Sequence, residues 1–164
     1  MILESPITTM LSFGGSTSAS SNTAQYITTQ AEQWLGRLQN SHALGLGAKG
    51  VFDDLRNVRN QCSSPDWDGY GALPVTDHTF IMALSFLKAL PLGIPAPTVG
   101  AEPDGQITLE WYRSPRHILS ISISPEGDLH YAALQGRRKN YGTEPYWGDV
   151  PQIILDLIHQ VGYS

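Results

Sequence analysis

The sequence predicts an α+β domain, in which a four-stranded antiparallel meander is flanked by helices in two layers. Apolar and polar side chains alternate along three segments, at residues 107–112, 119–124 and 129–134. A period of two with one apolar face indicates half-buried antiparallel strands. The near-identical turns Pro103-Asp104-Gly105 and Pro125-Glu126-Gly127 precede the first and third segments, and each suits a three-residue hairpin with Gly in the left-handed position.

The apolar rows also set the strand register, because a slip of one residue would send every apolar side chain to the opposite face. Matching these rows places Leu109 opposite Ile121, and Ile121 opposite Tyr131. The same rule places Val99 opposite Leu109, so that Thr98–Glu102 becomes the first of the four strands.

Helical periodicity occurs on both sides of the predicted strands. An N-terminal helical pair is predicted from apolar stripes that begin at Ile27 and Phe52, separated by the glycines at 45, 47 and 50. A third helix begins after Thr76, a favourable N-cap residue, and a closing helix carries the apolar stripe between Val150 and Val161. We therefore expect a flexible Ser/Thr-rich tail at 1–22, an N-terminal helical region at 23–62 and the α+β domain at 63–164.

Composition excludes several classes of protein. A chain of 164 residues can bury one core without disulfides or metals. The single Cys62 excludes an intrachain disulfide and a Cys-based zinc site. No apolar run approaches the ~18 residues of a membrane helix, and no basic signal region precedes Arg37, so a cytoplasmic location is expected. A net charge of −5 disfavours nonspecific nucleic-acid binding by the whole molecule.

The predicted register segregates the charges. The loop between the second and third strands lies at the same end of the meander as the exit of the fourth strand. Five of the ten basic residues therefore gather there, and acids occupy the opposite end. The basic end suits a phosphate or an acidic protein surface, and the alternative is a solvated loop cluster. The basic residues are Arg113, Arg116, Arg137, Arg138 and Lys139, and the acids are Glu102, Asp104, Glu126 and Asp128.

No catalytic arrangement is predicted on the outer face of the sheet. Glu110 and His130 lie two strands apart, or about 9.6 Å, whereas acid–base partners need about 3 Å. Ser122 is adjacent to His130, but an open sheet face lacks the oxyanion donors that a nucleophilic serine uses. The histidines show no metal-ligand spacing. We therefore expect no catalytic residue, no metal and no cofactor.

The loop Asp66-Trp67-Asp68-Gly69-Tyr70-Gly71 is the most unusual local sequence. Its two acids match part of a calcium loop, but the remaining ligands are missing. Two interpretations stay open. Trp67 and Tyr70 would anchor a partner, as aromatic residues do at interface hot spots, or they would fold onto the core while Asp68 binds nearby backbone amides.

Together with the helix, hairpin and strand that follow it, this loop resembles a recurrent type of small bacterial protein with no established activity. The resemblance covers about residues 64–160 and implies a bacterial or mobile-element origin, but it implies no catalytic residue.

The sequence favours a non-enzymatic protein-interaction module, such as an inhibitor, an antitoxin-like factor or an accessory subunit, whose partner is another protein. Trp67, Asp68, Tyr70 and the five basic residues are the candidate partner-binding residues. The alternative is a nucleic-acid-binding accessory protein that uses the basic cluster, for which binding should weaken steeply with salt.

Overall fold

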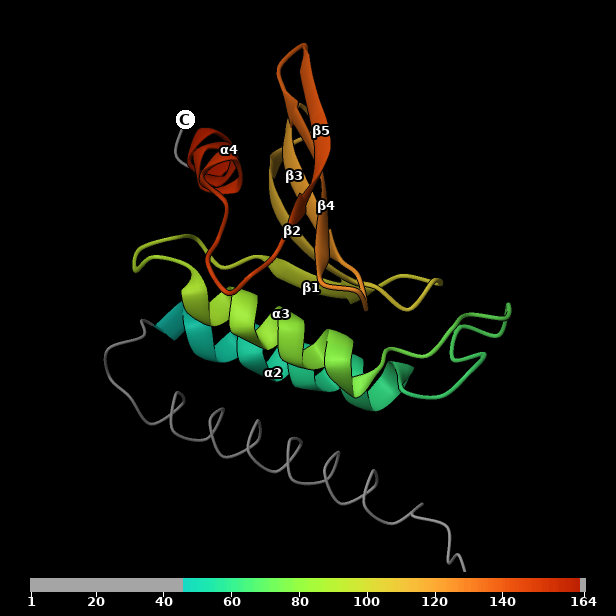
Figure 1. Cartoon of the computed structure of the whole chain (residues 1–164). Helices are drawn as coiled ribbons and strands as arrows, with labels where there is room; N and C mark the ends of the chain where they lie inside the picture. Colours follow the sequence, from blue (N-terminus) through green and yellow to red (C-terminus); the bar gives the residue numbers. More distant parts are fainter. Residues whose placement is uncertain (1–45, 163–164) are drawn as a thin grey trace, which may run out of the picture.

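A computed structural model of the chain describes residues 46–162. Within that range three helices and five strands follow one another (Figure 1). None of these helices is long and apolar enough to cross a membrane. In chain order the elements are α2 (Leu46–Cys62), α3 (Asp77–Ala89), β1 (Thr98–Ala101), β2 (Ile107–Ser114), β3 (His117–Ile123), β4 (Asp128–Gln135), β5 (Arg138–Pro145) and α4 (Gln152–Gly162).

The α+β class is confirmed, but the number of predicted strands is wrong. The described residues form one antiparallel sheet in the order β1-β2-β3-β4-β5, so the meander has five strands rather than four. The missed strand is β5, which pairs with β4 along its whole length. Its residues are mostly exposed and show no apolar alternation, and therefore they lack the pattern by which the other strands were recognised.

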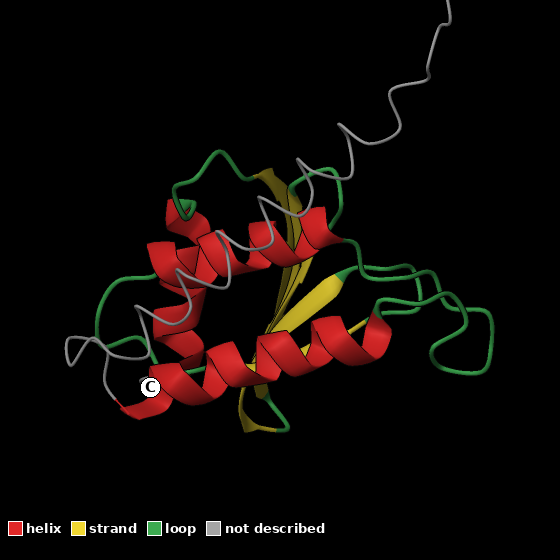
Figure 2. Ribbon diagram, turned by 90° about the horizontal axis from the view of Figure 1, so that it is seen from below, coloured by secondary structure: helices red, strands yellow, loops and turns green. Residues whose placement is uncertain are grey.

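The helices lie on one face and below one end of the sheet. α4 packs along the face formed by β2, β3 and β4 (Figure 1). α2 and α3 pack against each other, and α4 runs across their direction (Figure 2). α2 also contacts β1, so one edge of the sheet is covered by a helix.

One of the two predicted N-terminal helices lies within the described residues. α2 corresponds to the second predicted helix, but it begins at Leu46, so Gly47 and Gly50 lie inside the helix rather than before it. The first predicted helix, from Ile27, and the tail at 1–22 lie outside the described residues.

The predicted register is confirmed at each position named above. Leu109 pairs with both Val99 and Ile121, and Ile121 pairs with Tyr131. Both predicted hairpin glycines are left-handed, since Gly105 has φ +85° and Gly127 has φ +91°. The inner-face side chains of the central strands are consequently buried.

A single apolar core lies between the sheet and the helices. Each helix and the central strands contribute fully buried side chains, which provide most of the driving force for folding. The buried residues of α2 belong to this same core. The core therefore includes residues on both sides of positions 62 and 63, where the predicted N-terminal helical region meets the predicted α+β domain. The largest of these side chains are Leu55, Phe80, Phe86, Ile107, Leu109, Leu119, Ile121, Ile123, Leu129, Ile154 and Leu157.

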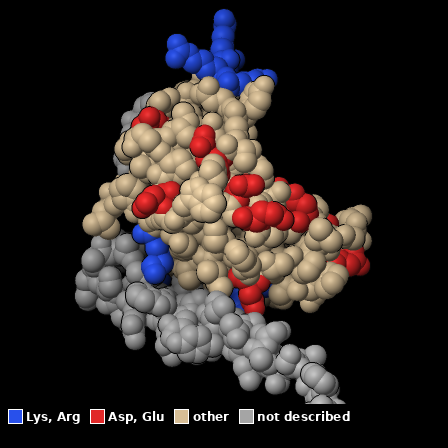
Figure 3. Space-filling model, viewed as in Figure 1, with Lys and Arg blue, Asp and Glu red and all other residues tan. Residues whose placement is uncertain are grey.

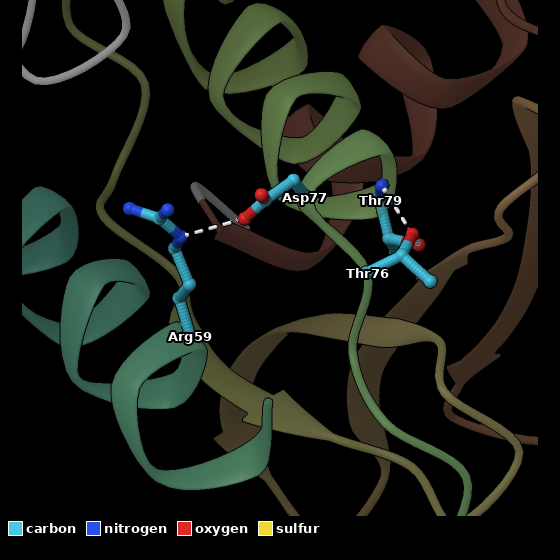
Figure 4. Close-up of polar contacts among 4 residues, drawn as sticks. All are labelled: Arg59, Thr76, Asp77 and Thr79. Carbon is cyan, nitrogen blue, oxygen red and sulfur yellow. Dashed lines mark hydrogen bonds and ion pairs between the residues drawn. The ribbon is translucent and has the colours of Figure 1, made fainter. Parts of the chain in front are cut away.

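Polar contacts hold the start of α3 against α2 (Figure 4). Thr76 is the N-cap, as predicted, and its hydroxyl accepts a hydrogen bond from the backbone N–H of Thr79 at 3.1 Å. Arg59 Nε donates to the carboxylate of Asp77 at 3.0 Å. The same guanidinium lies 5.0 Å from the ring centre of Phe80, a cation–π distance.

Candidate functional site

Two hairpin turns lie side by side at one end of the sheet. Pro115 and Arg116 join β2 to β3, and Gly136 and Arg137 join β4 to β5. The backbone N–H of Gly136 donates to the carbonyl oxygen of Arg116 at 2.7 Å. Gly136 has φ +64°, which is typical of the first turn residue of a type II′ hairpin. The hydrogen bond joins the two turns into one tip.

This tip brings together all five basic residues that the sequence places at one end. Arg113 is the extra residue of a β-bulge in β2. All five side chains are exposed, and none forms an ion pair with another residue in the range 46–162. Figure 3 shows basic side chains clustered at this end of the molecule and separated from the acids. We call Arg113, Arg116, Arg137, Arg138 and Lys139 the basic tip.

Three members of the basic tip lie in strands rather than in loops: Arg113 in β2, and Arg138 and Lys139 in β5. Arg138 and Lys139 are the first residues of β5, where successive side chains point to opposite faces of the sheet. Lys139 pairs with Leu134 on the outer face, and Arg138 pairs with Gln135. The basic tip therefore presents charge on both faces as well as at its end.

Exposed tyrosines accompany the basic tip on the outer face. Tyr112 in β2 is 59% exposed, and Tyr141 in β5 is 82% exposed. Between them, β3 and β4 contribute the half-buried Ile118 and Leu134, which pair with each other. The outer face near the basic tip thus combines cations with aromatic and aliphatic surface.

Two of the four carboxylates at the opposite end of the sheet, Glu102 and Asp104, have internal partners. Glu102 accepts hydrogen bonds from the hydroxyls of Thr108 and Ser122. Asp104 accepts hydrogen bonds from the backbone and side-chain nitrogens of Gln106, at 3.2 and 2.8 Å. Glu102 thus joins the end of β1 to both β2 and β3, and Asp104 closes the β1–β2 turn.

Glu110, Ser122 and His130 form no nucleophile–base pair on the outer face. Glu110 lies on β2 and His130 on β4, two strands apart. Ser122 pairs with His130 in the ladder, but its hydroxyl donates to Glu102. His130 Nδ1 lies 2.9 Å from the hydroxyl of Thr143. Ser122 and His130 are therefore each engaged in a hydrogen bond on the sheet surface.

The two acids of the Asp66–Gly71 loop bind its backbone. Asp66 has φ +60°, and its carboxylate accepts from the N–H of Gly71 at 2.7 Å. Asp68 accepts from the N–H of Tyr70 at 2.8 Å and from that of Ala72 at 3.1 Å. The loop is consequently closed by its own carboxylates.

Trp67 attaches the loop to the core. Its indole N–H donates to the carbonyl oxygen of Leu73 at 2.9 Å, and the half-buried ring packs on the core. The N–H of Leu73 in turn donates to the carbonyl oxygen of Pro103 at 2.8 Å, which joins the loop to the β1–β2 turn. These contacts match the structural interpretation for Trp67 and Asp68. Tyr70 is 94% exposed, so the interpretation in which both aromatic residues fold onto the core is wrong for Tyr70.

The aromatic residues before α4 have different environments. Tyr146 is buried, and its ring meets that of Phe86 edge-on at 5.7 Å. Its hydroxyl lies 3.0 Å from that of Ser85. Burial raises the pKa of Tyr146, the charge of Asp149 adds to this rise, and the bond to Ser85 opposes it. Trp147, by contrast, is 88% exposed.

Metal-binding geometry is absent from the part of the chain that the structure describes, since no group of three His, Cys, Asp or Glu side chains is placed to hold an ion. Cys62 is a free, buried thiol, and its burial raises its pKa. A raised pKa reduces the thiolate fraction on which cysteine reactivity depends.

Comparison of the chain with models of protein families, with curated proteins and with solved structures finds no match.

Proposed function

We propose that this protein is a non-enzymatic interaction protein, of the inhibitor or accessory-subunit kind, whose basic tip binds an acidic surface of another protein. The observation that carries the proposal is the cluster of five exposed cations at adjoining hairpin turns, without an ion-pair partner in residues 46–162.

The distribution of charge supports a partner that is anionic where it contacts the basic tip. The chain as a whole carries a net charge of −5, so five cations at one end create a strong charge asymmetry. Clustered charges of one sign steer an oppositely charged partner and set its orientation. Arg side chains suit this role because the guanidinium forms bidentate hydrogen bonds with carboxylates.

The surface beside the cations supports a protein partner in particular. The exposed Tyr112 pairs with Ile118, which pairs with Leu134, and the exposed Tyr141 lies diagonally from Leu134 on the same face. Tyr and Arg are enriched at protein–protein hot spots. A patch that mixes both with aliphatic surface can bury apolar area as well as pair charges.

The second candidate function is nucleic-acid binding at the same surface. The specific observation that favours it is the exposed Tyr141 on the same face of β5 as Lys139, because bases stack on exposed aromatic rings near cations. Against it, the acids that cover the opposite end of the sheet would repel a polyanion that extends along the molecule (Figure 3).

Binding of two labelled probes, an oligoglutamate peptide and a single-stranded DNA of equal charge, tests the proposal by fluorescence anisotropy. We expect the peptide to bind, and Arg116→Glu to weaken its binding by about 1 kcal/mol, or about fivefold. The matched control is Lys49→Glu, which makes the same charge change at an exposed position on α2.

The outcome discriminates the two functions. Tighter binding of the DNA, with affinity that falls steeply as salt rises, would favour the nucleic-acid function instead. If both probes bind weakly and Arg116→Glu acts no more strongly than Lys49→Glu, the basic tip is not a binding surface.

A further inference from the structure

The two edges of the sheet differ in how they are covered. β1 lies against α2, whereas β5 is the last strand and pairs only with β4 within the described residues (Figure 1). β5 has eight residues, Arg138–Pro145. A long edge strand leaves a row of N–H and C=O groups available to another strand.

The faces of β5 are also largely uncovered. α4 contacts β2, β3 and β4 but not β5. On the inner face Gly142 and Glu144 are half-buried, and the ring of Tyr131 lies where a β-carbon on Gly142 would stand. Six of the eight residues of the strand are exposed. A strand with so little burial gains stability when a further strand pairs with it.

The hairpin geometry identifies the free backbone groups. Gln135 and Arg138 close a two-residue turn, so they form a hydrogen-bonded pair, and the pairs then alternate along the ladder. The odd-numbered residues of β5 belong to the other class of pair. The N–H and C=O groups of Lys139, Tyr141 and Thr143 therefore point away from β4, toward the open edge.

We propose that the open edge of β5 pairs antiparallel with β5 of a second copy of this chain, about a two-fold axis at Tyr141. In this register Tyr141 pairs with Tyr141 of the second copy, and Lys139 pairs with Thr143. These are the residues whose backbone groups point outward, so the pairing satisfies all of them. The two sheets become one continuous sheet across the axis.

The side chains of β5 complement themselves in this register. Arg138 of each copy lies directly opposite Glu144 of the other, and both residues point to the inner face. Opposite charges at facing positions stabilise a strand pair, whereas like charges destabilise it. The two Tyr141 rings meet on the outer face as a cross-strand aromatic pair. Shifting the register by two residues in either direction loses both contacts.

Charge segregation along the whole sheet favours the same partner. A two-fold axis across an antiparallel pair runs the two sheets in opposite directions. The basic tip of each copy then lies beside the acidic end of the other, where Asp128 and Glu144 are located. A strand from an unrelated protein need not carry charges that complement the basic tip and the acidic end. For this reason the observations favour a second copy.

Sedimentation equilibrium of the full chain over the micromolar range tests the pairing. We expect a monomer–dimer equilibrium whose dissociation constant rises about tenfold in Glu144→Arg, because two attractive pairs become repulsive. The double variant Arg138→Glu/Glu144→Arg exchanges the charges and should restore the wild-type constant. Asp54→Arg is the matched control, since it makes the same charge change on an exposed part of α2.

Cysteine cross-linking tests the register. Facing residues of a hydrogen-bonded antiparallel pair have Cα atoms about 5.5 Å apart, within the range of a disulfide. Tyr141→Cys should therefore form a covalent dimer on mild oxidation, whereas Lys139→Cys should not, because Lys139 faces Thr143. The native Cys62 is buried and should not interfere.

A chain that stays monomeric over this concentration range overturns the proposal. So does a dimer that Glu144→Arg leaves unchanged, or one in which Lys139→Cys cross-links as fast as Tyr141→Cys. The inference does not depend on the proposed function: oligoglutamate binding reports on Arg116 at a turn, and dimer mass reports on the β5 edge.

Discussion

At the acidic end of the sheet the turns are bonded to other parts of the chain, whereas at the basic end the two turns bond to each other. In the β1–β2 turn the carbonyl oxygen of Pro103 accepts a hydrogen bond from the N–H of Leu73, and Gly105 packs closely against the carbonyl oxygen of Pro74. The β3–β4 turn contributes the carbonyl oxygen of Gly127, which accepts from the N–H of Tyr146. At the basic end, the corresponding contact is the bond between Gly136 and Arg116.

The charged side chains of the two ends differ in a similar way: some acids accept hydrogen bonds within the chain, whereas the basic side chains are exposed to solvent. Asp66, Asp68, Glu102 and Asp104 each accept hydrogen bonds from nearby groups. The side chains of the basic tip are exposed and have no ion-pair partner in the described range. Charge alone therefore does not mark an interaction surface, and the absence of internal partners is the more informative property.

The largest expected effect comes from adding a methyl group at a turn of the acidic end. Gly105 has φ +85°, and a β-carbon there would lie 2.9 Å from the carbonyl oxygen of Pro74. Gly105→Ala therefore combines a left-handed backbone with a backbone clash, and we expect a loss of about 3 kcal/mol in the free energy of unfolding. Urea denaturation measures it.

Gly136→Ala is the matched change at the basic end. Gly136 also has positive φ, but nothing lies within 4 Å of the added carbon. The loss should be only about 1 kcal/mol, from the left-handed backbone alone. Equal losses in the two variants would contradict the contrast between the ends.

An intermediate effect is expected in the Asp66–Gly71 loop. Asp68→Ala leaves the N–H groups of Tyr70 and Ala72 without their acceptor, which should lower the free energy of unfolding by about 2 kcal/mol. Asp68→Asn keeps an acceptor oxygen and should lose less. Tyr70→Ala should leave stability unchanged, because the side chain is almost fully exposed. Thermal denaturation ranks the three variants.

The smallest effect is expected for the basic tip itself. Arg116→Gln removes a charge that has no ion-pair partner within residues 46–162, so its free energy of unfolding should change by less than about 0.5 kcal/mol. The same variant should weaken binding of the oligoglutamate probe. A large loss of stability here would assign the cation a structural role instead.

The predictable parts of the fold are those in which burial shapes the sequence. β2, β3 and β4 each bury one face, and their alternation set the register correctly down to Leu109 opposite Ile121. β5 buries neither face fully, so apolar and polar residues do not alternate along it. The one local signal was Gly136-Arg137, which suits a two-residue hairpin turn directly after a strand.

The candidate site was predictable where it followed from register and unpredictable where it followed from loop closure. The convergence of Arg113 and Arg116 with Arg137 required only the antiparallel order of the strands. The roles of Trp67 and Asp68 depended on which backbone groups they reach, namely Leu73, Tyr70 and Ala72. The sequence allowed both this arrangement and one in which the aromatic residues anchor a partner. It could not decide between them, because the contact of the loop with the β1–β2 turn through Leu73 and Pro103 arises only in the folded chain.

α4 covers the sheet only as far as β4, so β5 is the strand at which local opening is expected. β5 should separate from β4 more readily than the central strands separate from one another, because α4 contacts β2, β3 and β4 but not β5. Amide protons of Asn140, Gly142 and Glu144, which point toward β4, should therefore exchange with solvent through local fraying. Those of β3 should exchange only when the whole domain unfolds. Within the described residues β5 is thus the strand that we expect to open most readily, and pairing with β5 of a second copy would suppress this opening.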